Sequence, residues 1–158
     1  MRALVLGGSV FVGHRLVSAL AAGGHEVHVL NRGRTATEFP AGVQLIVADR
    51  TDAASMRAAL EGTTWDVIYD VSGFVMAAGG SDIEALVELV DGSVGHYIYV
   101  SSIMAYDQSL VGVMPWTEDM PTDSSGARGY GGFKAMAEAA MLALSLIHIS
   151  EPTRRRGI

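Results

Sequence analysis

The sequence reads LVLGGSVFVG from residue 4 to residue 13. The apolar residues at its start are partly β-branched, and the glycine pair after them is typical of a buried strand that ends in a tight turn. Apolar positions then recur at helical spacing up to Leu20, and a second glycine pair at 23–24 marks the end of that pattern. We therefore predict a strand over 2–6 followed by a helix over 12–20.

The same alternation of short apolar runs and helical patterns continues along the chain. Strands that alternate with helices form parallel sheets with right-handed crossovers. We expect an α/β domain of the Rossmann type, with a doubly wound parallel sheet of about five strands in the order 3-2-1-4-5. The other predicted strands cover 26–30, 45–48, 67–70 and 97–100. The other predicted helices are one that Asp52 caps and that runs to Leu60, one over 82–90 and one over 132–144.

Composition narrows the class of protein. The 158 residues are 49% hydrophobic and 18% charged, which suits one compact domain with a buried sheet. A net charge of −6 argues against nucleic-acid or anionic-membrane partners. There is no cysteine and the five histidines are scattered, so we expect no disulfide and no metal site. The chain shows no signal peptide and no membrane-spanning apolar stretch, so we expect a cytoplasmic protein.

The end of the chain has an unusual sequence. From Leu144 it reads LSLIHISEPTR, which resembles the in-frame translation of a transposase adapter used in DNA sequencing libraries. We therefore expect residues 1–143 to form one Rossmann domain whose C-terminal, substrate-binding part is missing, and residues 144–158 to be a non-native tail. The alternative is a natural helix extension with a basic tail at 154–156, which would suggest contact with nucleic acid.

A glycine-rich turn between a first strand and a first helix suits the pyrophosphate of a dinucleotide. Glycines allow a close backbone approach, and the free N–H groups at the helix start attract negative charge. An ordinary strand-to-helix turn is the alternative. Val10 departs from the pattern GxxGxxG, because it replaces the middle glycine and narrows the space for a pyrophosphate. The candidate cofactor contacts here are Gly7, Gly8, Ser9, Phe11, Val12 and Gly13.

The end of the second strand bears on the choice of cofactor. A site for NAD normally places an acidic residue there, on the adenosine ribose, whereas this chain has Asn31 followed by Arg32 and Arg34. Two guanidinium groups suit the 2′-phosphate of NADP, so we favour NADP over NAD; a solvated turn is the alternative. Asp49 is placed to accept a hydrogen bond from the adenine amino group, or else to cap the next helix, and we include Arg50 beside it among the candidate contacts.

A Tyr-x-x-x-Lys pair opens the last predicted helix. Tyr130 and Lys134 lie one helical turn apart and so share a face. A neighbouring ammonium stabilises a phenolate, so this tyrosine could act as a general acid/base on a substrate hydroxyl or carbonyl. The lysine would also hold the nicotinamide ribose. A serine at the end of the preceding strand, in Val-Ser-Ser at 100–102, could hydrogen-bond the same substrate oxygen.

Taken in order, these motifs resemble the extended short-chain dehydrogenase/reductases, the NAD-dependent epimerase/dehydratase family, across residues 1–143. Within that family the chain is most similar to the bacterial branch that carries GGTRFIG and NRG motifs, which is similar to chloroplast stem-loop-binding proteins. The motifs that carry the resemblance are GGSVFVG, Asp49, VSS, WTEDMP and YGGFK.

The resemblance implies roles for further residues. Ser102, four residues before Tyr106, aligns with the catalytic serine or threonine, and Ser101 is the second choice and a cofactor contact. Family members often dimerise through helices, and the run Ala135 to Ala143 offers such a surface, with core packing as the alternative. Asp70, at the end of the fourth strand, has no role that the sequence assigns. Further cofactor contacts are implied at Val71, Ser72 and Gly73.

Three functions remain open at this stage. The first is an NADP- or NAD-dependent reductase, epimerase or dehydratase acting on a nucleotide sugar or similar hydroxylated small molecule. The second is a non-catalytic dinucleotide-binding or RNA-binding module, against which the acidic composition counts. The third is an inert piece of an enzyme, because without the missing part a substrate could not be enclosed. We expect an enzymatic parent protein and an inactive fragment.

Overall fold

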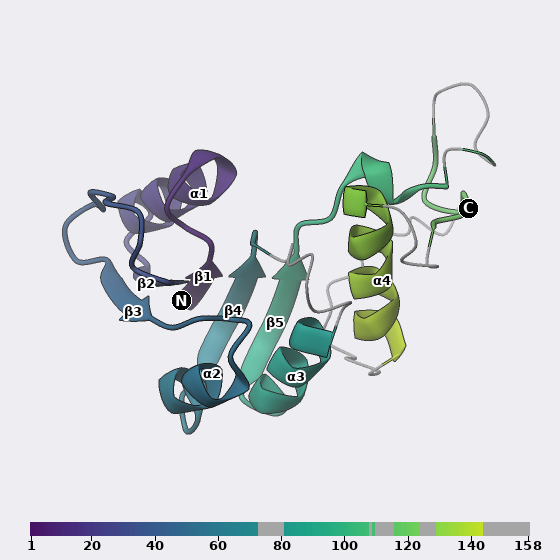
Figure 1. Ribbon diagram of the computed structural model, residues 1–158. Coiled ribbons are helices and arrows are strands. Elements are labelled where there is room, and N and C mark those ends of the chain that lie inside the picture. Colours follow the sequence, from purple (N-terminus) through teal and green to yellow (C-terminus); the bar gives the residue numbers. More distant parts are fainter. Residues whose placement is uncertain (73–80, 108, 110–115, 124–128, 144–158) are drawn as a thin grey trace, which may run out of the picture.

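The computed structural model describes residues 1–72, 81–107, 109, 116–123 and 129–143. It contains a five-stranded sheet in the order β3-β2-β1-β4-β5, with every neighbouring pair parallel (Figure 1). The predicted fold class and strand order are thereby confirmed. In chain order the elements are β1 (Arg2–Leu6), α1 (Phe11–Ala22), β2 (Glu26–Asn31), β3 (Gln44–Val47), α2 (Ala53–Leu60), β4 (Trp65–Asp70), α3 (Ser81–Val90), β5 (Val94–Tyr99), the short 3-10 helix η1 (Ile103–Ala105) and α4 (Gly129–Ala143).

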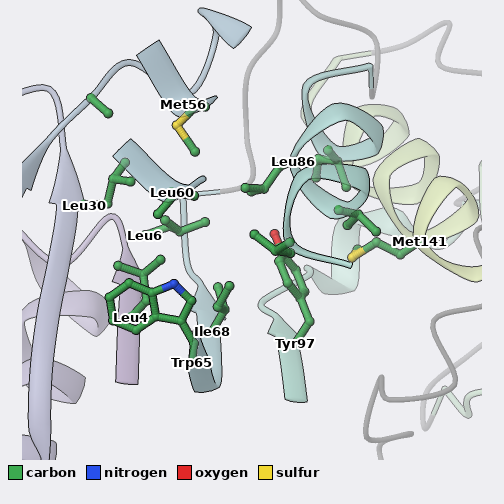
Figure 2. Close-up of a cluster of buried hydrophobic side chains, with 14 of the residues drawn as sticks. Leu4, Leu6, Leu30, Met56, Leu60, Trp65, Ile68, Leu86, Tyr97 and Met141 are labelled. Carbon is green, nitrogen blue, oxygen red and sulfur yellow. The ribbon is translucent and has the colours of Figure 1, made fainter. Parts of the chain in front are cut away.

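Each face of the sheet carries its own hydrophobic cluster. Helices α2, α3 and α4 cover one face, where Leu4, Ile68 and Tyr97 of three adjacent strands meet Leu86 and Met141 of the helices (Figure 2). Helix α1 packs on the other face through Val17 and Leu20. The central strand β1 is buried from Ala3 to Leu6, on both faces of the sheet, which explains why it reads as a nearly continuous apolar run. Strand β4 is buried at most of its positions, and Asp66 near its start is exposed. Full burial of one such aliphatic side chain contributes roughly 1.5–3 kcal/mol.

Two elements start three residues earlier than the sequence pattern predicts. Strand β5 begins at Val94 and not at Tyr97, although Gly95 interrupts its apolar pattern. A side chain at Gly95 would collide with the backbone carbonyl oxygen of Asp66, so this glycine permits the close approach of β4 and β5. Helix α4 begins at Gly129 and not at Gly132, which places Tyr130 inside its first turn.

The carboxyl ends of three strands meet at one edge of the sheet. Leu6 of β1 is paired with Asp70 of β4, which is in turn paired with Tyr99 of β5. The chain leaves β1 toward β2 and leaves β4 toward β5, so the direction of winding reverses between β1 and β4. Ligands of doubly wound folds bind outside the strand ends at this kind of switch point.

Two sequence-based expectations concern the rest of the chain. The predicted non-native tail, 144–158, lies outside the described residues. Among the helices that the structure describes, none combines the length and the apolar character needed to cross a membrane.

Candidate cofactor-binding and catalytic site

A cavity of about 930 Å³ lies along the carboxyl edge of the sheet. It extends from the glycine turn after β1, past the ends of β2 and β3, to the first turn of α4. All the site residues proposed from the sequence line it, with three exceptions. Gly8 and Ser102 do not line the cavity, and Gly73 lies outside the described residues. Topology thus brings together residues that are more than 120 positions apart, from Gly7 to Lys134.

Each glycine of the turn is needed for a different structural reason. Gly7 has a φ of 90°, in the region that favours glycine, and a side chain there would collide with Ser72. A side chain at Gly13 would collide with the carbonyl oxygen of Gly7, so this glycine lets helix α1 approach the end of β1. Gly8 faces the core, where a Cβ would lie 2.9 Å from side-chain atoms of Val17 and Val29. A glycine is therefore needed at this position for core packing, and the expected contact of Gly8 with a cofactor stays a prediction.

The two residues before the body of α1 are apolar and exposed. The side chain of Val10 is 61% exposed and that of Phe11 is 86% exposed, and both line the cavity. Phe11 has a φ of 47°, which is uncommon for a non-glycine residue and is found most often at functional sites. Val10 therefore occupies part of the space beside the glycine turn, as expected from its place in the motif.

Asn31 ties the end of β2 to the glycine turn. Its side-chain amide donates to Ser9 Oγ at 2.8 Å, and its Oδ1 accepts from the backbone N–H of Gly33 at 2.7 Å. The second contact fixes the turn that carries Arg32 and Arg34, both of which are exposed and line the cavity. An aspartate lacks the N–H that makes the first contact, which gives a physical reason for asparagine at a position that is acidic in NAD sites.

Asp49 lies beside this pair of arginines. Its Oδ1 accepts hydrogen bonds from the backbone N–H and the hydroxyl of Thr51, at 3.1 Å and 2.7 Å. These bonds, and more weakly the charges of Arg32 and Arg34, hold the pKa of Asp49 below its ordinary value of 3.8. The carboxylate is therefore an acceptor at neutral pH. The alternative role of helix cap belongs to Asp52, whose side chain accepts from the backbone N–H of Ala54 and of Ser55.

A buried ionic network lies at the end of β4, where the sequence assigned no role to Asp70. The Asp70 side chain is fully buried and accepts two hydrogen bonds from the Arg50 guanidinium, at 2.8 Å and 3.0 Å. It also accepts from Tyr97 Oη at 2.8 Å and from the backbone N–H of Ser72 at 3.1 Å. Burial alone would raise the pKa of Asp70, but the charge and hydrogen bonds of Arg50, together with the hydrogen bonds from Tyr97 and Ser72, outweigh burial and hold it below 3.8.

Sequence reasoning missed this network because its members are distant in the chain. Arg50 and Asp70 are 20 residues apart and Tyr97 is 27 residues beyond Asp70. The signal that could have revealed the network is Asp70 itself, a charged residue at the end of the predicted strand 67–70. A carboxylate buried there requires a partner. Nothing in the local spacing identifies Arg50 as that partner.

Lys134 occupies the other end of the cavity. Lys134 is only 3% exposed, and its Nζ donates to the carbonyl oxygen of Val100 at 2.7 Å. Nζ lies 4.6 Å from the ring centroid of Tyr99 and 5.8 Å from that of Tyr130. Burial lowers the pKa of Lys134 below its ordinary value of 10.5, while the charge of Asp70 raises it and that of Arg50 lowers it. The half-exposed Tyr130 and the buried ammonium thus share one end of the cavity, as the Tyr-x-x-x-Lys spacing predicts.

The two serines after β5 have different surroundings. Ser102 caps the 3-10 helix η1, and its Oγ accepts from the backbone N–H of Met104 at 3.2 Å. Ser101 lines the cavity, and within the described residues its Oγ is the buried side-chain polar atom without a hydrogen-bond partner. Buried hydroxyls normally have partners, so this atom is suited to a bound ligand. The structure therefore places the second-choice serine, and not Ser102, on the cavity wall.

These features fit a dinucleotide. The glycine turn gives the close backbone approach that a pyrophosphate needs, and Ser101 Oγ offers an unused hydrogen-bonding group near the Tyr130 end. Within the described part of the chain, no group of three or more His, Cys, Asp or Glu residues is placed to hold a metal ion. The cations, backbone N–H groups and hydroxyls of the cavity lining suit an organic anion.

Comparison with known proteins identifies relatives of this chain. A family model described as NAD(P)H-binding matches residues 7–141. Among curated proteins, the chloroplast stem-loop binding protein of 41 kDa b from Arabidopsis thaliana is 26% identical over 133 residues, covering 76% of this chain and 33% of that protein.

Solved structures share the fold at low sequence identity. The crystal structure of UDP-glucose 4-epimerase matches with a TM-score of 0.76 and 20% identity, over 94% of this chain and 49% of that one. The Bordetella bronchiseptica enzyme WbmG, solved with NAD and UDP, matches with a TM-score of 0.74 and 20% identity over 90% and 49%. A short-chain dehydrogenase/reductase superfamily protein from Agrobacterium tumefaciens with bound NAD matches with a TM-score of 0.70 and 21% identity, over 89% of this chain and 44% of that one. The chain spans about half the length of these structures and a third of the curated relative.

Proposed function

Because this chain belongs to the NAD(P)H-binding family, we propose that it is the cofactor-binding half of an NADP-dependent reductase, epimerase or dehydratase. The substrate class would be a hydroxylated small molecule such as a nucleotide sugar, as the names of the epimerase-like neighbours suggest. Residues 1–143 would form the cofactor domain. The residues that bind the substrate would lie in another part of the parent protein. The proposed location is the cytoplasm.

The charge of the cavity carries the proposal. The whole chain has a net charge of −6, yet four cationic side chains line the cavity and only one acidic side chain, Asp49, is among its described lining residues. Arg50 is paired with the Asp70 carboxylate, and the other three cations attract an anionic ligand against the overall charge. The four cationic residues of the lining are Arg32, Arg34, Arg50 and Lys134.

The position of these cations favours NADP over NAD. Arg32 and Arg34 follow β2 directly, at the strand end that receives the adenosine ribose in Rossmann folds. The residue at this strand end is Asn31 and not an acidic residue, and its side chain holds the turn. Paired guanidinium groups bind a phosphate more strongly than a ribose hydroxyl, because their hydrogen bonds to it are charge-assisted.

The residues at the other end would carry the proton chemistry. A bound nicotinamide would accept or supply a hydride there. Tyr130 would exchange a proton with a substrate hydroxyl or carbonyl through its phenol, and the Lys134 ammonium would stabilise the phenolate form. The bond from Lys134 Nζ to Val100 O fixes the ammonium in place. A hydroxyl of Ser101 or Ser102 would donate to the substrate oxygen and stabilise its developing charge.

Titration of the purified chain with NADPH and with NADH, followed by nicotinamide fluorescence, tests this proposal. We expect NADPH to bind about tenfold more tightly than NADH, a difference of about 1.4 kcal/mol. The double variant Arg32→Ser, Arg34→Ser should lose this preference. Arg57→Ser, which changes an exposed arginine of α2, is the matched control and should keep it. Failure of both cofactors to bind would contradict the proposal.

A second function is favoured by one observation. The curated relative is named a stem-loop binding protein, so a non-catalytic module that binds a nucleic-acid stem-loop is the alternative. The net charge of −6 opposes it, since nucleic-acid affinity depends on neutralising phosphates. Retardation of a labelled RNA hairpin on a gel at low salt by the chain, with no NADPH binding, would favour the module over the enzyme.

A further inference from the structure

The buried network of Arg50, Asp70 and Tyr97 connects the two ends of the cavity. Arg50 follows β3 and lines the cavity beside Asp49, at the end proposed for adenosine. Asp70 ends β4 and Tyr97 lies in β5, so the network spans strands that belong to both halves of the sheet. The side chains of the Arg50–Asp70 ion pair are only 9% and 0% exposed.

The backbone continues this connection to Lys134. The carbonyl oxygen of Asp70 accepts from the backbone N–H of Val100 at 2.9 Å, and the carbonyl oxygen of Val100 accepts from Lys134 Nζ at 2.7 Å. On the other side, the guanidinium of Arg50 donates to Ser72 Oγ at 3.0 Å, and Ser72 packs against Gly7 of the glycine turn. Four hydrogen bonds to one carboxylate therefore hold the loop after β3, the glycine turn and the lysine anchor in a fixed relation.

We propose that Arg50, Asp70 and Tyr97 are positioning residues that hold the adenosine end and the Tyr130–Lys134 end of the cavity in register for one extended dinucleotide. The inference rests on the proposed function of the cavity. A dinucleotide must contact both ends at once, so a shift of one end relative to the other weakens binding even where every direct contact residue is intact. A buried ion pair is a weak source of stability compared with apolar packing, which agrees with a role in positioning.

An apolar replacement separates positioning from stability. The triple variant Arg50→Met, Asp70→Leu, Tyr97→Phe removes the charges and the hydroxyl of all three side chains together, so it leaves no charged partner of the network unpaired. The part-buried Ser72 loses its contacts with Arg50 and Asp70. Its thermal midpoint should stay near that of the wild type. The dissociation constant for NADPH should rise by about tenfold, the change that corresponds to about 1.4 kcal/mol. Tyr97→Phe alone leaves the cavity-lining Arg50 in place and should also raise the constant; if it does not, the loss in the triple variant is that of a direct Arg50 contact and the inference is overturned. Arg57→Met, which removes one partner of the exposed pair with Glu61, is the control and should leave the constant unchanged.

The outcomes separate the inference from the proposed function. A triple variant that is folded and binds NADPH within twofold of the wild type overturns the inference and leaves the proposed function intact. If the triple variant does not fold, Asp70→Asn, titrated at a temperature where it is folded, decides by the same criterion.

If the wild type binds neither cofactor, the proposed function is wrong, and amide hydrogen exchange still tests the network. Faster exchange of the Val100 N–H in the variant, relative to the amides of β1, would support coupling of Asp70 to the lysine anchor. Equal exchange at Val100 and in β1 would overturn the inference.

Discussion

Asn31 shows how one side chain decides the chemistry of a neighbouring loop. Its amide donates to Ser9 and accepts from Gly33, so one residue orders both the glycine turn and the turn that carries the two arginines. The sequence alone shows that the residue at the end of β2 is not acidic. It could not predict the contact of Asn31 with Ser9, because Ser9 is 22 residues away and the contact depends on the pairing of β1 with β2.

Replacing Asn31 by aspartate should shift the cofactor preference toward NADH. The carboxylate would repel the 2′-phosphate of NADPH and accept from the ribose hydroxyl of NADH, while its Oδ1 still accepts from Gly33. We expect the ratio of the two dissociation constants to change by about tenfold, which corresponds to about 1.4 kcal/mol. Fluorescence titration of both cofactors measures this ratio, and a ratio equal to that of the wild type would argue against a 2′-phosphate site at this turn.

Asp70 should make stability depend on pH in the acid range. Its pKa is held below the ordinary value of 3.8, so its ion pair stabilises the fold fully above about pH 5 and is lost as the pH falls through the lower folded value. Asp70→Asn leaves Arg50 buried without a counter-charge and should cost about 3–5 kcal/mol at pH 7. Urea unfolding at several pH values measures both effects. The difference between wild type and variant should shrink below pH 3.8, and a difference that stays constant there would contradict the assigned pKa shift.

At the scale of elements, turn chemistry was predicted better than element boundaries. The cap of α2 by Asp52 is confirmed, because a cap is a local pattern. The early starts of β5 and α4 were missed. In β5 the reason is Gly95, which is typical of a strand end in sequence and lies against the backbone of Asp66 in the structure. The core packing of Gly8 was also not predicted, since a glycine that faces a ligand and one that faces a core look alike in sequence.

The junction of β1 and α1 should not tolerate a side chain at Gly13. In Gly13→Ala the new methyl group collides with the Gly7 carbonyl oxygen and approaches Val71, so helix α1 must move away from the strand end. We expect a loss of about 1–3 kcal/mol in unfolding free energy and weaker NADPH binding, measured by urea unfolding and by titration.

A matched control lowers the unfolding free energy through a residue that does not line the cavity. Asp52→Ala deletes the cap of α2 and should cost about 1 kcal/mol without changing cofactor affinity. If both variants weaken NADPH binding equally, the effect of Gly13→Ala reflects general destabilisation and not the turn.

At the scale of the whole molecule, the sheet follows from the sequence and the coupling across it does not. Alternation of apolar runs and helical patterns predicted a parallel sheet in the observed order, because these periodicities are properties of single segments. The cavity gathers residues from Gly7 to Lys134 and was predictable where a motif places them at strand ends. The Arg50–Asp70–Tyr97 network was not, since it is defined by distances between strands.

The domain limits lead to a further expectation. If residues 144–158 are a non-native tail, a chain that ends at Ala143 should keep the cofactor affinity and the thermal midpoint of the full chain within experimental error. Calorimetry and fluorescence titration of the two proteins, made side by side, provide the comparison. A clear loss of stability or affinity on shortening would show that the tail takes part in the fold, contrary to our expectation.

The central claim is that one dinucleotide occupies the whole cavity, and amide chemical-shift mapping with NADP⁺ tests it most directly. We predict that titration shifts the amide signals of the glycine turn at 7–13, of the arginine turn at 32–34, and of Val100 and Ser101 near Lys134, all with one saturation curve. The amides of β3 and of the far end of α3 should not shift. Absence of any change, or changes confined to one end of the cavity, would contradict the account.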